Sequence, residues 1–356
     1  MEHTRVVALV PAHDEEAALP AALASLRGQT VPPDRVVVVA DRCTDGTVAV
    51  ARAHGVEVLE VGDNPHRKAG ALNQAIRCVE LDDADLLLVL DADSALAETF
   101  LETARAHLAD ETVGAVGGIF HGRPGGGLPG ALQRNEYARY AREIRHRGGR
   151  ARVLTGTATV FRVDTLRRVA EARGTRLPGR PGDVYDAHTL TEDNEITLAV
   201  RTLGLRALSP AGCEVETEVM PTWRDLWHQR LRWQRGALEN LGAYGLTRVT
   251  APYWLQQAGM YAGIGAVGLF LLATALFAAL GELGPPRGPW LALTAVFLVE
   301  RVWTVRRRGA RGMLLAAPLL LEFGYDLVQQ AVFLTAAGAV VGGREARWHH
   351  LTPAPA

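Results

Sequence analysis

The alternation of apolar strands and helical segments near the N-terminus most constrains the fold of this chain. Short runs rich in valine and leucine occupy residues 5–11, 35–41, 56–61 and 85–93. Such continuous apolar runs are typical of parallel strands that are buried on both faces, and parallel strands need crossover helices. The pattern therefore predicts an α/β fold, with a mostly parallel sheet and helices on both faces. The expected helices between the strands cover residues 15–28, 44–53 and 68–80.

Acidic residues follow three of the predicted strands. Glu15 lies just after the first strand, Asp41 ends the second, and Asp91 and Asp93 end the fourth. Ligands of parallel sheets bind beyond the carboxyl ends of the strands. Asp91 and Asp93 are two residues apart, so their side chains can point the same way. Two such carboxylates suit Mg²⁺ or Mn²⁺, with phosphate oxygens completing the shell.

Lys68 is the only lysine in the chain, although Lys and Arg together number 38. A single leftover lysine in an arginine-rich chain could be chance. The alternative is a tight anion site, because an ammonium group is compact whereas a guanidinium is a broad planar fork. Lys68 opens a predicted helix, where free backbone N–H groups favour anions, and Gly70 allows close approach of a ligand. A diphosphate is the anion that we expect there.

The bulk composition excludes some classes of function. The net charge of −1 over 356 residues excludes a polycation that binds nucleic acid. The three cysteines are widely spaced, which fits a reducing compartment and gives no zinc pattern. The N-terminus lacks the layout of a signal peptide, so we expect the N-terminal part to be cytosolic.

The C-terminal part has a different, apolar character. Residues 260–280 carry no charge, a length that can cross a bilayer as a helix. Residues 289–305 and 313–341 are further candidates, and buried helices of a soluble domain are the alternative for each. The basic loop 306–312 predicts, by the positive-inside bias, that this loop is cytosolic. We therefore expect a multi-pass protein of the cell (inner or plasma) membrane, with two or three spans and a cytoplasmic catalytic domain.

Seven motifs occur in an order that resembles a known family. They are VPAHDEE, VVVVADRCTDGT, RKAGALNQA, LVLDADS, TGTATVFR, TEDNEITLAV and QRLRW. Together they resemble the family 2 glycosyltransferases of the GT-A fold over roughly residues 5–240. The similarity is strongest to the membrane-embedded branch that includes cellulose, chitin, hyaluronan and poly-N-acetylglucosamine synthases. The resemblance implies metal-dependent, inverting transfer of a sugar from a UDP-sugar to a hydroxyl of a glycan or lipid-linked acceptor. UDP-GlcNAc and UDP-glucose are the donors that we expect first.

The resemblance also implies roles for individual residues, and Asp193 would be the catalytic base. The metal ion, Mg²⁺ or Mn²⁺, would be bound by Asp93 and Asp91. The nucleotide-sugar would contact Pro11, His13, Glu15, Asp41, Lys68, Asp91 and Arg232. The acceptor would contact Thr155, Gly156, Thr157, Glu192, Gln229 and Trp233.

Three segments outside the predicted sheet each allow a functional prediction and an ordinary structural alternative. Residues 191–203 form a predicted helix whose first-turn acids could simply complement the helix dipole. Residues 222–241 form an amphipathic helix that we expect at the membrane surface, and an ordinary core helix is the alternative. The arginine-rich segment 132–152 is a second candidate for contact with anionic lipid, or else a solvated helix.

The expected organisation is a catalytic domain over 1–220, an interfacial helix over 221–250, a membrane region over 251–341 and a tail over 342–356. Two or three spans are too few for a self-contained polymer channel. A homo-oligomer or a partner subunit could supply the remaining helices of such a channel.

Three other functions stay open at this stage. They are a polyprenyl-phosphate glycosyltransferase, a sugar nucleotidyltransferase and a non-catalytic membrane binding module. The nucleotidyltransferase needs a glycine-rich loop after the first strand, where this chain has PAHDEE.

Overall fold

The computed structural model describes residues 4–282, 284–285 and 288–343. The chain divides into two compact units, Met1–Trp223 and Arg224–Ala356, and each is described by itself. Residues 344–356, most of the expected tail, lie outside the described part.

The first unit is built on a seven-stranded sheet with the strand order β3-β2-β1-β4-β8-β6-β9. The first four strands in this order, β3, β2, β1 and β4, are parallel to one another, and β6 is parallel to β9. Strand β8 runs antiparallel to both β4 and β6. The predicted mostly parallel α/β sheet is confirmed. Its strands are β1 (Val6–Ala12), β2 (Arg35–Asp41), β3 (Glu57–Val61), β4 (Leu86–Leu90), β6 (Val113–Gly117), β8 (Ala158–Arg162) and β9 (Arg206–Leu208).

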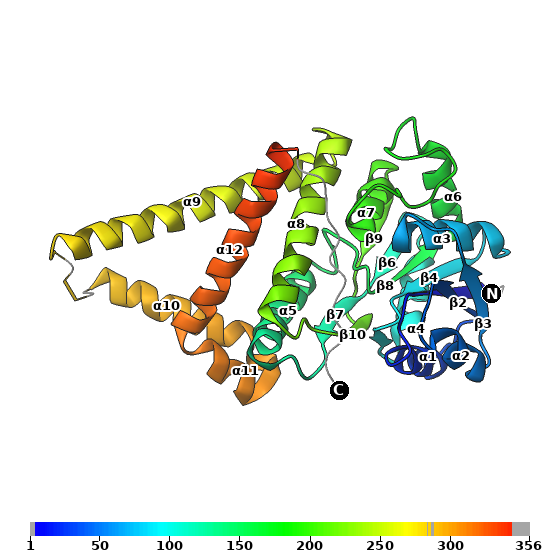
Figure 1. Cartoon of the computed structure of the whole chain (residues 1–356), viewed down its shortest axis with the longest axis horizontal. Coiled ribbons are helices and arrows are strands. Elements are labelled where there is room, and N and C mark those ends of the chain that lie inside the picture. Colours follow the sequence, from blue (N-terminus) through cyan, green and yellow to red (C-terminus); the bar gives the residue numbers. More distant parts are fainter. Residues whose placement is uncertain (1–3, 283, 286–287, 344–356) are drawn as a thin grey trace. The chain divides into compact units, whose positions relative to one another are not determined.

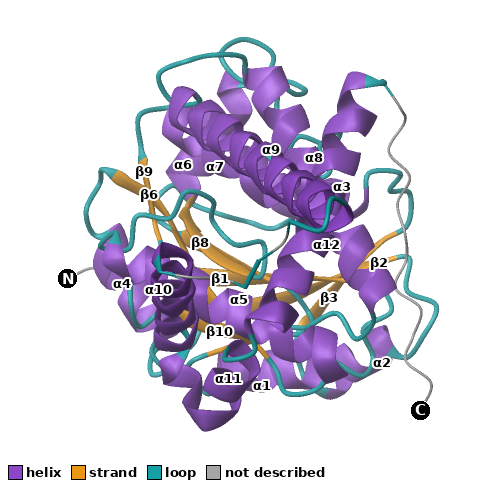
Figure 2. Cartoon of the chain, turned by 90° about the vertical axis from the view of Figure 1, so that its left-hand side faces the viewer, coloured by secondary structure: helices purple, strands orange, loops and turns teal. Residues whose placement is uncertain are grey.

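Helices cover both faces of this sheet (Figures 1 and 2). Helices α3, α6 and α7 lie on one face, and α1, α2 and α4 lie on the other. The helices of the unit are α1 (Leu19–Arg27), α2 (Thr47–Ala53), α3 (Arg67–Cys78), α4 (Phe100–Leu108), α5 (Gly127–His146), α6 (Val163–Ala172) and α7 (Glu192–Thr202).

The strands are apolar throughout because both of their faces are covered. Val6, Ala8 and Val10 of β1 join one hydrophobic core with Leu23 of α1 and Phe100 of α4. Their neighbours at 7 and 9 are equally buried, and alternate residues of a strand point to opposite faces. The central strand therefore has no solvent-facing side.

A small second sheet lies next to the end of β4. Its strand order is β5 (Ala95–Leu96), β10 (Glu214–Thr217) and β7 (Ile119–Gly122). Strand β5 begins two residues after Asp93, and the Ser94 hydroxyl lies 3.1 Å from the Thr217 hydroxyl. This pairing fixes the segment that carries Asp91 and Asp93.

Helix ends differ from the sequence expectation where turns intervene. Helix α2 begins at Thr47 rather than at residue 44, because Thr44 and Asp45 donate backbone hydrogen bonds to Asp14 and form a turn. Helix α5 ends at His146, within the arginine-rich segment 132–152, because Gly148 and Gly149 take positive φ values. Glycine adopts that conformation without strain and ends many helices.

The second unit is helical. In its described residues, α9 is the one helix that is long and apolar enough to cross a membrane, and most of its side chains are exposed. The third predicted span is instead two helices, α11 and α12, separated at Pro318, which has no N–H to continue a helix. The helices are α8 (Trp223–Tyr244), α9 (Ala251–Ala279), α10 (Pro289–Thr304), a short 3₁₀ turn η1 (Arg306–Arg308), α11 (Gly309–Ala316) and α12 (Leu319–Val341).

Candidate functional site

The carboxyl end of β4 is the centre of the site. Asp91 follows Leu90 directly, and its backbone N–H donates to the Thr157 carbonyl at 2.9 Å. The N–H of Ser94 donates back to the Asp91 carbonyl at 3.0 Å. The loop before β8 and the Asp91–Asp93 segment are therefore held together by the antiparallel pairing of β4 with β8.

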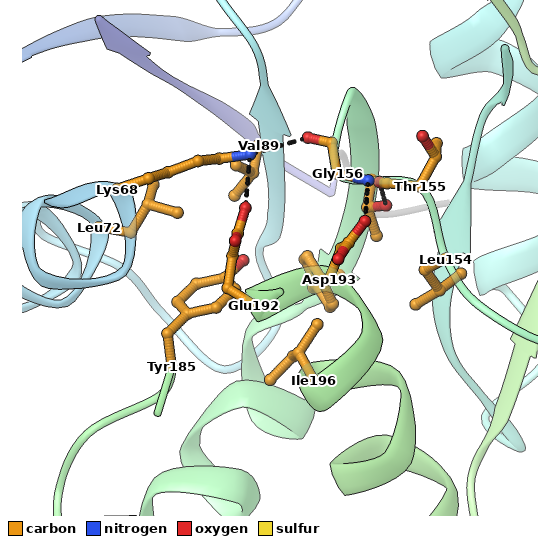
Figure 3. A pocket seen from close by; sticks show the side chains of 12 residues that line it. Lys68, Leu72, Val89, Leu154, Thr155, Gly156, Tyr185, Glu192, Asp193 and Ile196 are labelled. Atoms are coloured by element: carbon orange, nitrogen blue, oxygen red, sulfur yellow. Dashed lines mark hydrogen bonds and ion pairs between the residues drawn. The ribbon is translucent and has the colours of Figure 1, made fainter. Parts of the chain in front are cut away.

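Lys68 joins this strand end to two other segments. Its Nζ lies 2.6 Å from Asp91 Oδ1. It also lies 2.9 Å from Glu192 Oε1, a contact that Figure 3 draws. It also donates to the Gly156 carbonyl at 3.0 Å. Burial acts to lower the pKa of Lys68, but the carboxylates of Asp91 and Glu192 raise it above its ordinary value. The side chain is therefore a permanent cation.

Asp193 is held on the other side of Gly156. Its Oδ2 accepts the Gly156 N–H at 3.1 Å, and its Oδ1 accepts the Asn194 N–H at 2.7 Å. Both carboxylate oxygens are thus oriented by backbone N–H groups. Thr155 and Thr157 flank Gly156, and their hydroxyls are hydrogen-bonded to each other at 2.8 Å. Acidic residues begin α7 at its N-terminus, where the helix dipole favours negative charge.

The acids around the end of β4 outnumber the nearby cations. Burial raises the pKa of Asp91 to about 6, with Asp93 and Glu192 adding to this and Lys68 opposing it. Burial, with the charges of Asp93, Glu218 and Asp91, raises the pKa of Glu15 to about 8.

The pKa of Asp93 is raised too, again mainly by burial. Asp91 already has the ammonium of Lys68, whereas the Asp93 carboxylate accepts a hydrogen bond from the neutral Ser94 hydroxyl at 2.9 Å. Hard carboxylate oxygens with unbalanced charge are what Mg²⁺ and Mn²⁺ require. The residues therefore fit a divalent cation, and Asp93 fits it better than Asp91.

The expected nucleotide side lies at the ends of β1 and β2. Asp41 is buried, and its Oδ2 accepts from the Asn64 amide at 2.8 Å. Its Oδ1 is also buried and accepts no hydrogen bond from the described residues, with Arg42 Nε 3.5 Å away. His13 Nδ1 lies 2.6 Å from the Asp41 carbonyl. Pro11 lies in the last part of β1, and Glu15 follows the end of that strand by three residues.

Backbone strain is concentrated at this edge. Asp14, Arg42 and Arg67 are the non-glycine residues with positive φ in the described chain, and they follow β1, β2 and β3. Such conformations cost energy and are common at functional sites. Gly70 lets Asn64 pack closely at the same edge, because a Cβ at position 70 would lie 2.0 Å from Asn64 Oδ1.

Lys68, Glu192 and Asp193 line a pocket, and its wall includes a residue that no sequence pattern indicated. Tyr185 is 3% exposed and lines the pocket with Lys68, Glu192 and Asp193. Its backbone is fixed by Asn73, whose Oδ1 accepts the Tyr185 N–H at 2.9 Å and whose Nδ2 donates to the Tyr185 carbonyl at 2.8 Å. The sequence assigned no role to either residue, although Asn73 lies in the RKAGALNQA motif, because their role depends on contacts between segments 112 residues apart.

A buried ion pair holds the same wall against α7. Arg173 and Glu195 are each 1% exposed and form a bidentate pair. Arg173 also donates to the carbonyls of Pro178 and Val184 at 2.8 and 2.6 Å. Glu195 lies two residues beyond Asp193, so this pair fixes the beginning of α7.

The remaining predicted residues, Gln229, Arg232 and Trp233, belong to α8 in the second unit. All three are partly buried there. The Arg230 guanidinium lies 4.2 Å from the centre of the Trp233 ring and 2.7 Å from Gln229 Oε1. Their role in the site stays a prediction.

A second acidic group lies on the turns after β1 and β2. Asp14, Cys43 and Asp45 bring ligand atoms within 4.8 Å of one another. However, Asp14 accepts from Thr44 at 2.6 Å, and Asp45 accepts from Thr47 at 2.9 Å. These carboxylates stabilise the turns, and we assign no metal ion to them.

Three solved structures illustrate the likeness to known proteins. The mannosyltransferase PcManGT from Pyrobaculum calidifontis, solved with GDP-mannose and Mn²⁺, is 21% identical with a TM-score of 0.63, covering 97% of this chain and 89% of its own. Residues 1–349 of TarS from S. aureus, solved with UDP, are 16% identical with a TM-score of 0.45, covering 98% and 94%. Glucosyl-3-phosphoglycerate synthase from Mycobacterium tuberculosis is 18% identical with a TM-score of 0.45, covering 68% and 81%. The first of these shows that the two proteins share a fold.

Comparison with the sequences of curated proteins gave no match. Residues 3–236, in contrast, match the family described as "Glycosyltransferase like family 2". That range contains the whole sheet, the Lys68 cluster and Asp193. The chain belongs to this glycosyltransferase family, and it is an enzyme of the GT-A fold.

Proposed function

We propose that the protein transfers a sugar from a nucleoside diphosphate sugar to an acceptor hydroxyl with inversion, with Asp193 as the base. The observation that carries this proposal is the contact between two motifs far apart in sequence. Lys68 and Gly156 join the Asp91 strand end to the first turn of α7, where Asp193 lies. A donor bound at the strand end would therefore have its reacting carbon near a base.

The donor side of the proposal rests on Asp41, His13 and the Asp91–Asp93 pair. The buried Oδ1 of Asp41 can accept a hydrogen bond from a nucleobase N–H or a ribose hydroxyl. Asp93, with Asp91 beside it, would hold Mg²⁺ or Mn²⁺ against the diphosphate. That cation would offset the negative charge that develops on the leaving nucleotide.

On the acceptor side, Asp193 would take the proton from the attacking hydroxyl. Its two oxygens are oriented by the N–H groups of Gly156 and Asn194, so the proton is removed in a fixed direction. The hydroxyl oxygen then attacks the anomeric carbon from the face opposite the leaving nucleotide, which inverts the configuration. Thr155, Thr157 and Glu192 would line the acceptor path, together with Gln229 and Trp233 of α8.

The membrane part of the proposal rests on α9. Its exposed leucines and phenylalanines need an apolar environment. We propose that α9 spans the cell membrane, that α10 and α12 complete a multi-pass region in contact with lipid, and that the catalytic unit faces the cytoplasm. A glycan or lipid-linked acceptor would then be presented at the inner leaflet.

A donor screen tests the reaction class. Detergent-solubilised protein is incubated with UDP-sugars and GDP-mannose, in Mg²⁺ or Mn²⁺, with extracted lipids or glycans as acceptors. UDP-sugars are the donors that we expect, and GDP-mannose is included because PcManGT was solved with it. Nucleotide release and product mass identify donor and acceptor together. No nucleotide release with any donor would contradict the proposal.

Asp193→Asn tests the base. We expect transfer to fall by about 10²–10⁴-fold, which is the usual contribution of a positioned acid–base group, while UDP or GDP affinity persists. Transfer by this variant at the wild-type rate would remove Asp193 from the role.

A polyprenyl-phosphate acceptor is a second candidate, favoured by the exposed apolar surface of α9. Arg232→Ala separates the two acceptors, because the polyprenyl-phosphate enzymes do not need the motif formed here by Gln229, Arg232 and Trp233 in QRLRW. Full activity of Arg232→Ala on polyprenyl phosphate would favour this acceptor, and lost activity would favour a glycan or another lipid-linked hydroxyl.

A further inference from the structure

The proposed mechanism gives no task to Tyr185, although this residue lines the pocket together with Asp193. We propose that Tyr185 is a specificity-determining residue, whose hydroxyl forms a hydrogen bond with a hydroxyl of the acceptor. The acceptor is then a polyol, such as a glycan or a sugar-bearing lipid, and not a phosphate. This inference rests on the proposed function, and it names the group that the acceptor presents beside the base.

The first support is that the Tyr185 hydroxyl is available to a ligand. Tyr185 is 3% exposed, but its hydroxyl forms no hydrogen bond with any residue that the structure describes. It is also not sealed away from solvent, as the buried Oδ1 of Asp41 is. The hydroxyl therefore opens into the pocket. Buried tyrosine hydroxyls usually have a hydrogen-bond partner, so a group that enters the pocket is the partner that we expect.

The second support is the rigid frame around this side chain. Asn73 Oδ1 accepts the N–H groups of Val184 and Tyr185 at 3.0 and 2.9 Å, and its Nδ2 donates to the Tyr185 carbonyl at 2.8 Å. Arg173, which is 1% exposed, donates to the Val184 carbonyl at 2.6 Å. Two buried polar side chains thus fix the backbone of one aromatic residue. A binding group needs such support to hold a substrate in a defined position.

The third support is the size of the space that Tyr185 lines. The pocket has room of about 20 Å³, which accommodates about one water-sized group. Much of its wall is apolar, with Leu72, Val89 and Ile196 among the lining residues, so few polar partners are present. Figure 3 shows the Tyr185 ring in this wall, next to Glu192. A single hydroxyl fits such a space, whereas a phosphate group is too large for it.

The charges around Tyr185 favour the same kind of acceptor. Lys68 and the cation proposed at the end of β4 would serve the donor's diphosphate, which leaves the carboxylates of Glu192 and Asp193 on the acceptor side. These carboxylates would repel a phosphate. Burial raises the pKa of Tyr185, the charges of Glu192 and Asp193 add to this, and Lys68 opposes it. The phenol therefore stays neutral, and its hydroxyl can donate to, or accept from, a sugar hydroxyl.

Tyr185→Phe removes only the hydroxyl, and it is tested in the full-length protein in detergent. Transfer to the acceptor found in the donor screen and hydrolysis of the donor by water are measured separately. We expect kcat/KM for the acceptor to fall by about 3–10-fold, which is the contribution of one hydrogen bond between neutral groups. Hydrolysis of the donor, the donor KM and the affinity for UDP or GDP with Mn²⁺ should keep their wild-type values.

Deoxy analogues of the acceptor give a readout that a structural role of Tyr185 would not change. One analogue should lower kcat/KM by about 3–10-fold with the wild type, and cause no further loss with Tyr185→Phe, because both changes remove the same bond. Tyr140→Phe is the matched control, since the Tyr140 hydroxyl lies 3.4 Å from the Val153 carbonyl and does not line the pocket. This control should respond to every analogue as the wild type does. Tyr185→Phe should also keep the wild-type melting temperature.

Three results would overturn the inference. One is wild-type transfer by Tyr185→Phe, which would mean that the space beside the hydroxyl holds only a resident water. Another is a loss of donor affinity or of donor hydrolysis that equals the loss of transfer. The third is transfer to farnesyl phosphate and to no glycan or glycolipid.

If the wild type turns over no donor, the proposed function fails, and binding of two disaccharides then decides the inference. Cellobiose and chitobiose, which carry the sugars of the expected donors, are titrated in the presence of UDP and Mg²⁺ by saturation-transfer NMR. The wild type should bind one of them about 3–10-fold more tightly than Tyr185→Phe does. Equal binding by the two proteins, or no binding by the wild type, would contradict the role of Tyr185.

Discussion

At the scale of single residues, carboxylates crowd the end of β4 and make the protein sensitive to pH. The pKa of Glu15 is about 8 in the folded chain, above its ordinary value of 4.5, because of burial and the nearby carboxylates. The folded state therefore keeps a proton that the unfolded chain loses at lower pH. Stability from this group is fully present below pH 4.5 and is lost as the pH rises through 8.

We therefore expect the melting temperature of the ligand-free protein to fall between pH 5 and pH 8. The fall should be about 2–4 °C for each kcal/mol of unfolding free energy that is lost. Glu15→Gln should flatten this dependence, whereas a change at the exposed Glu98 should not. Mn²⁺ should stabilise the wild type more at pH 8 than at pH 6, because a cation competes with protons for carboxylates. A wild-type melting temperature that does not change over this range would contradict the argument.

Gly70 allows a second residue-level prediction. A Cβ at this position would lie 2.0 Å from Asn64 Oδ1 and 2.8 Å from His66 Cβ. Gly70→Ala should therefore displace Asn64 from Asp41, weaken UDP or GDP binding, and cost about 1–3 kcal/mol of stability as an overpacked site. Gly62→Ala is the control, since a Cβ there meets nothing within 4 Å. Equal effects of the two changes on nucleotide affinity would show that Asn64 is not involved.

Motifs near strand ends were predictable because they depend on local pattern. Lys68, Asp91 and Asp193 each stand next to a recognisable strand or helix boundary, and the structure brings them together. Asn64 lies outside the seven motifs, and Asn73 lies within RKAGALNQA but was given no role from it. Their partners are defined by how distant segments pack, which no window of sequence contains.

At the scale of elements, the buried pair of Arg173 and Glu195 connects the wall of the pocket to α7. Arg173→Met leaves the Glu195 carboxylate buried without its partner, which should cost about 3–5 kcal/mol. The double variant with Glu195→Leu removes both charges and should regain most of that loss. Thermal unfolding of the full chain in detergent measures both.

The control for this pair is Arg167→Met, whose partner Asp83 is 66% exposed. Exposed pairs contribute about 0–1 kcal/mol. If the double variant is no more stable than Arg173→Met alone, the loss comes from the hydrogen bonds to Pro178 and Val184 and not from the orphaned charge.

Parallel strands were easier to predict than the rest of the sheet. Strand β2 has the predicted bounds, and β1 differs by one residue at each end, because continuous apolar runs identify strands that are buried on both faces. The antiparallel direction of β8 and the small sheet of β5, β10 and β7 depend on pairings between residues far apart. Local composition carries no information on those pairings.

At the scale of the whole molecule, hydropathy alone overstated the continuity of the C-terminal segments. The third predicted span contains Pro318, where the structure separates α11 from α12. Glu322 in α12 is 2% exposed and lies 3.3 Å from Arg301 of α10, and Asp326 pairs with the same arginine. Charged residues that pair between helices reduce the apolar character of both segments, although each segment is still helical.

The membrane proposal is tested most directly on α9. Leu269 is 68% exposed, and residues 260–280 carry no charge. Arginine near the centre of a spanning helix opposes insertion by about 2.5–3.5 kcal/mol, so Leu269→Arg should move a large share of the protein out of the membrane fraction after alkaline carbonate extraction. Leu246→Arg is the matched control, because Leu246 is 78% exposed but lies between α8 and α9. Leu246→Arg should stay in the membrane fraction. If both variants stay there, the apolar surface of α9 is not what holds the protein to the bilayer, and if both leave it, the charge acts through general destabilisation of the helical unit.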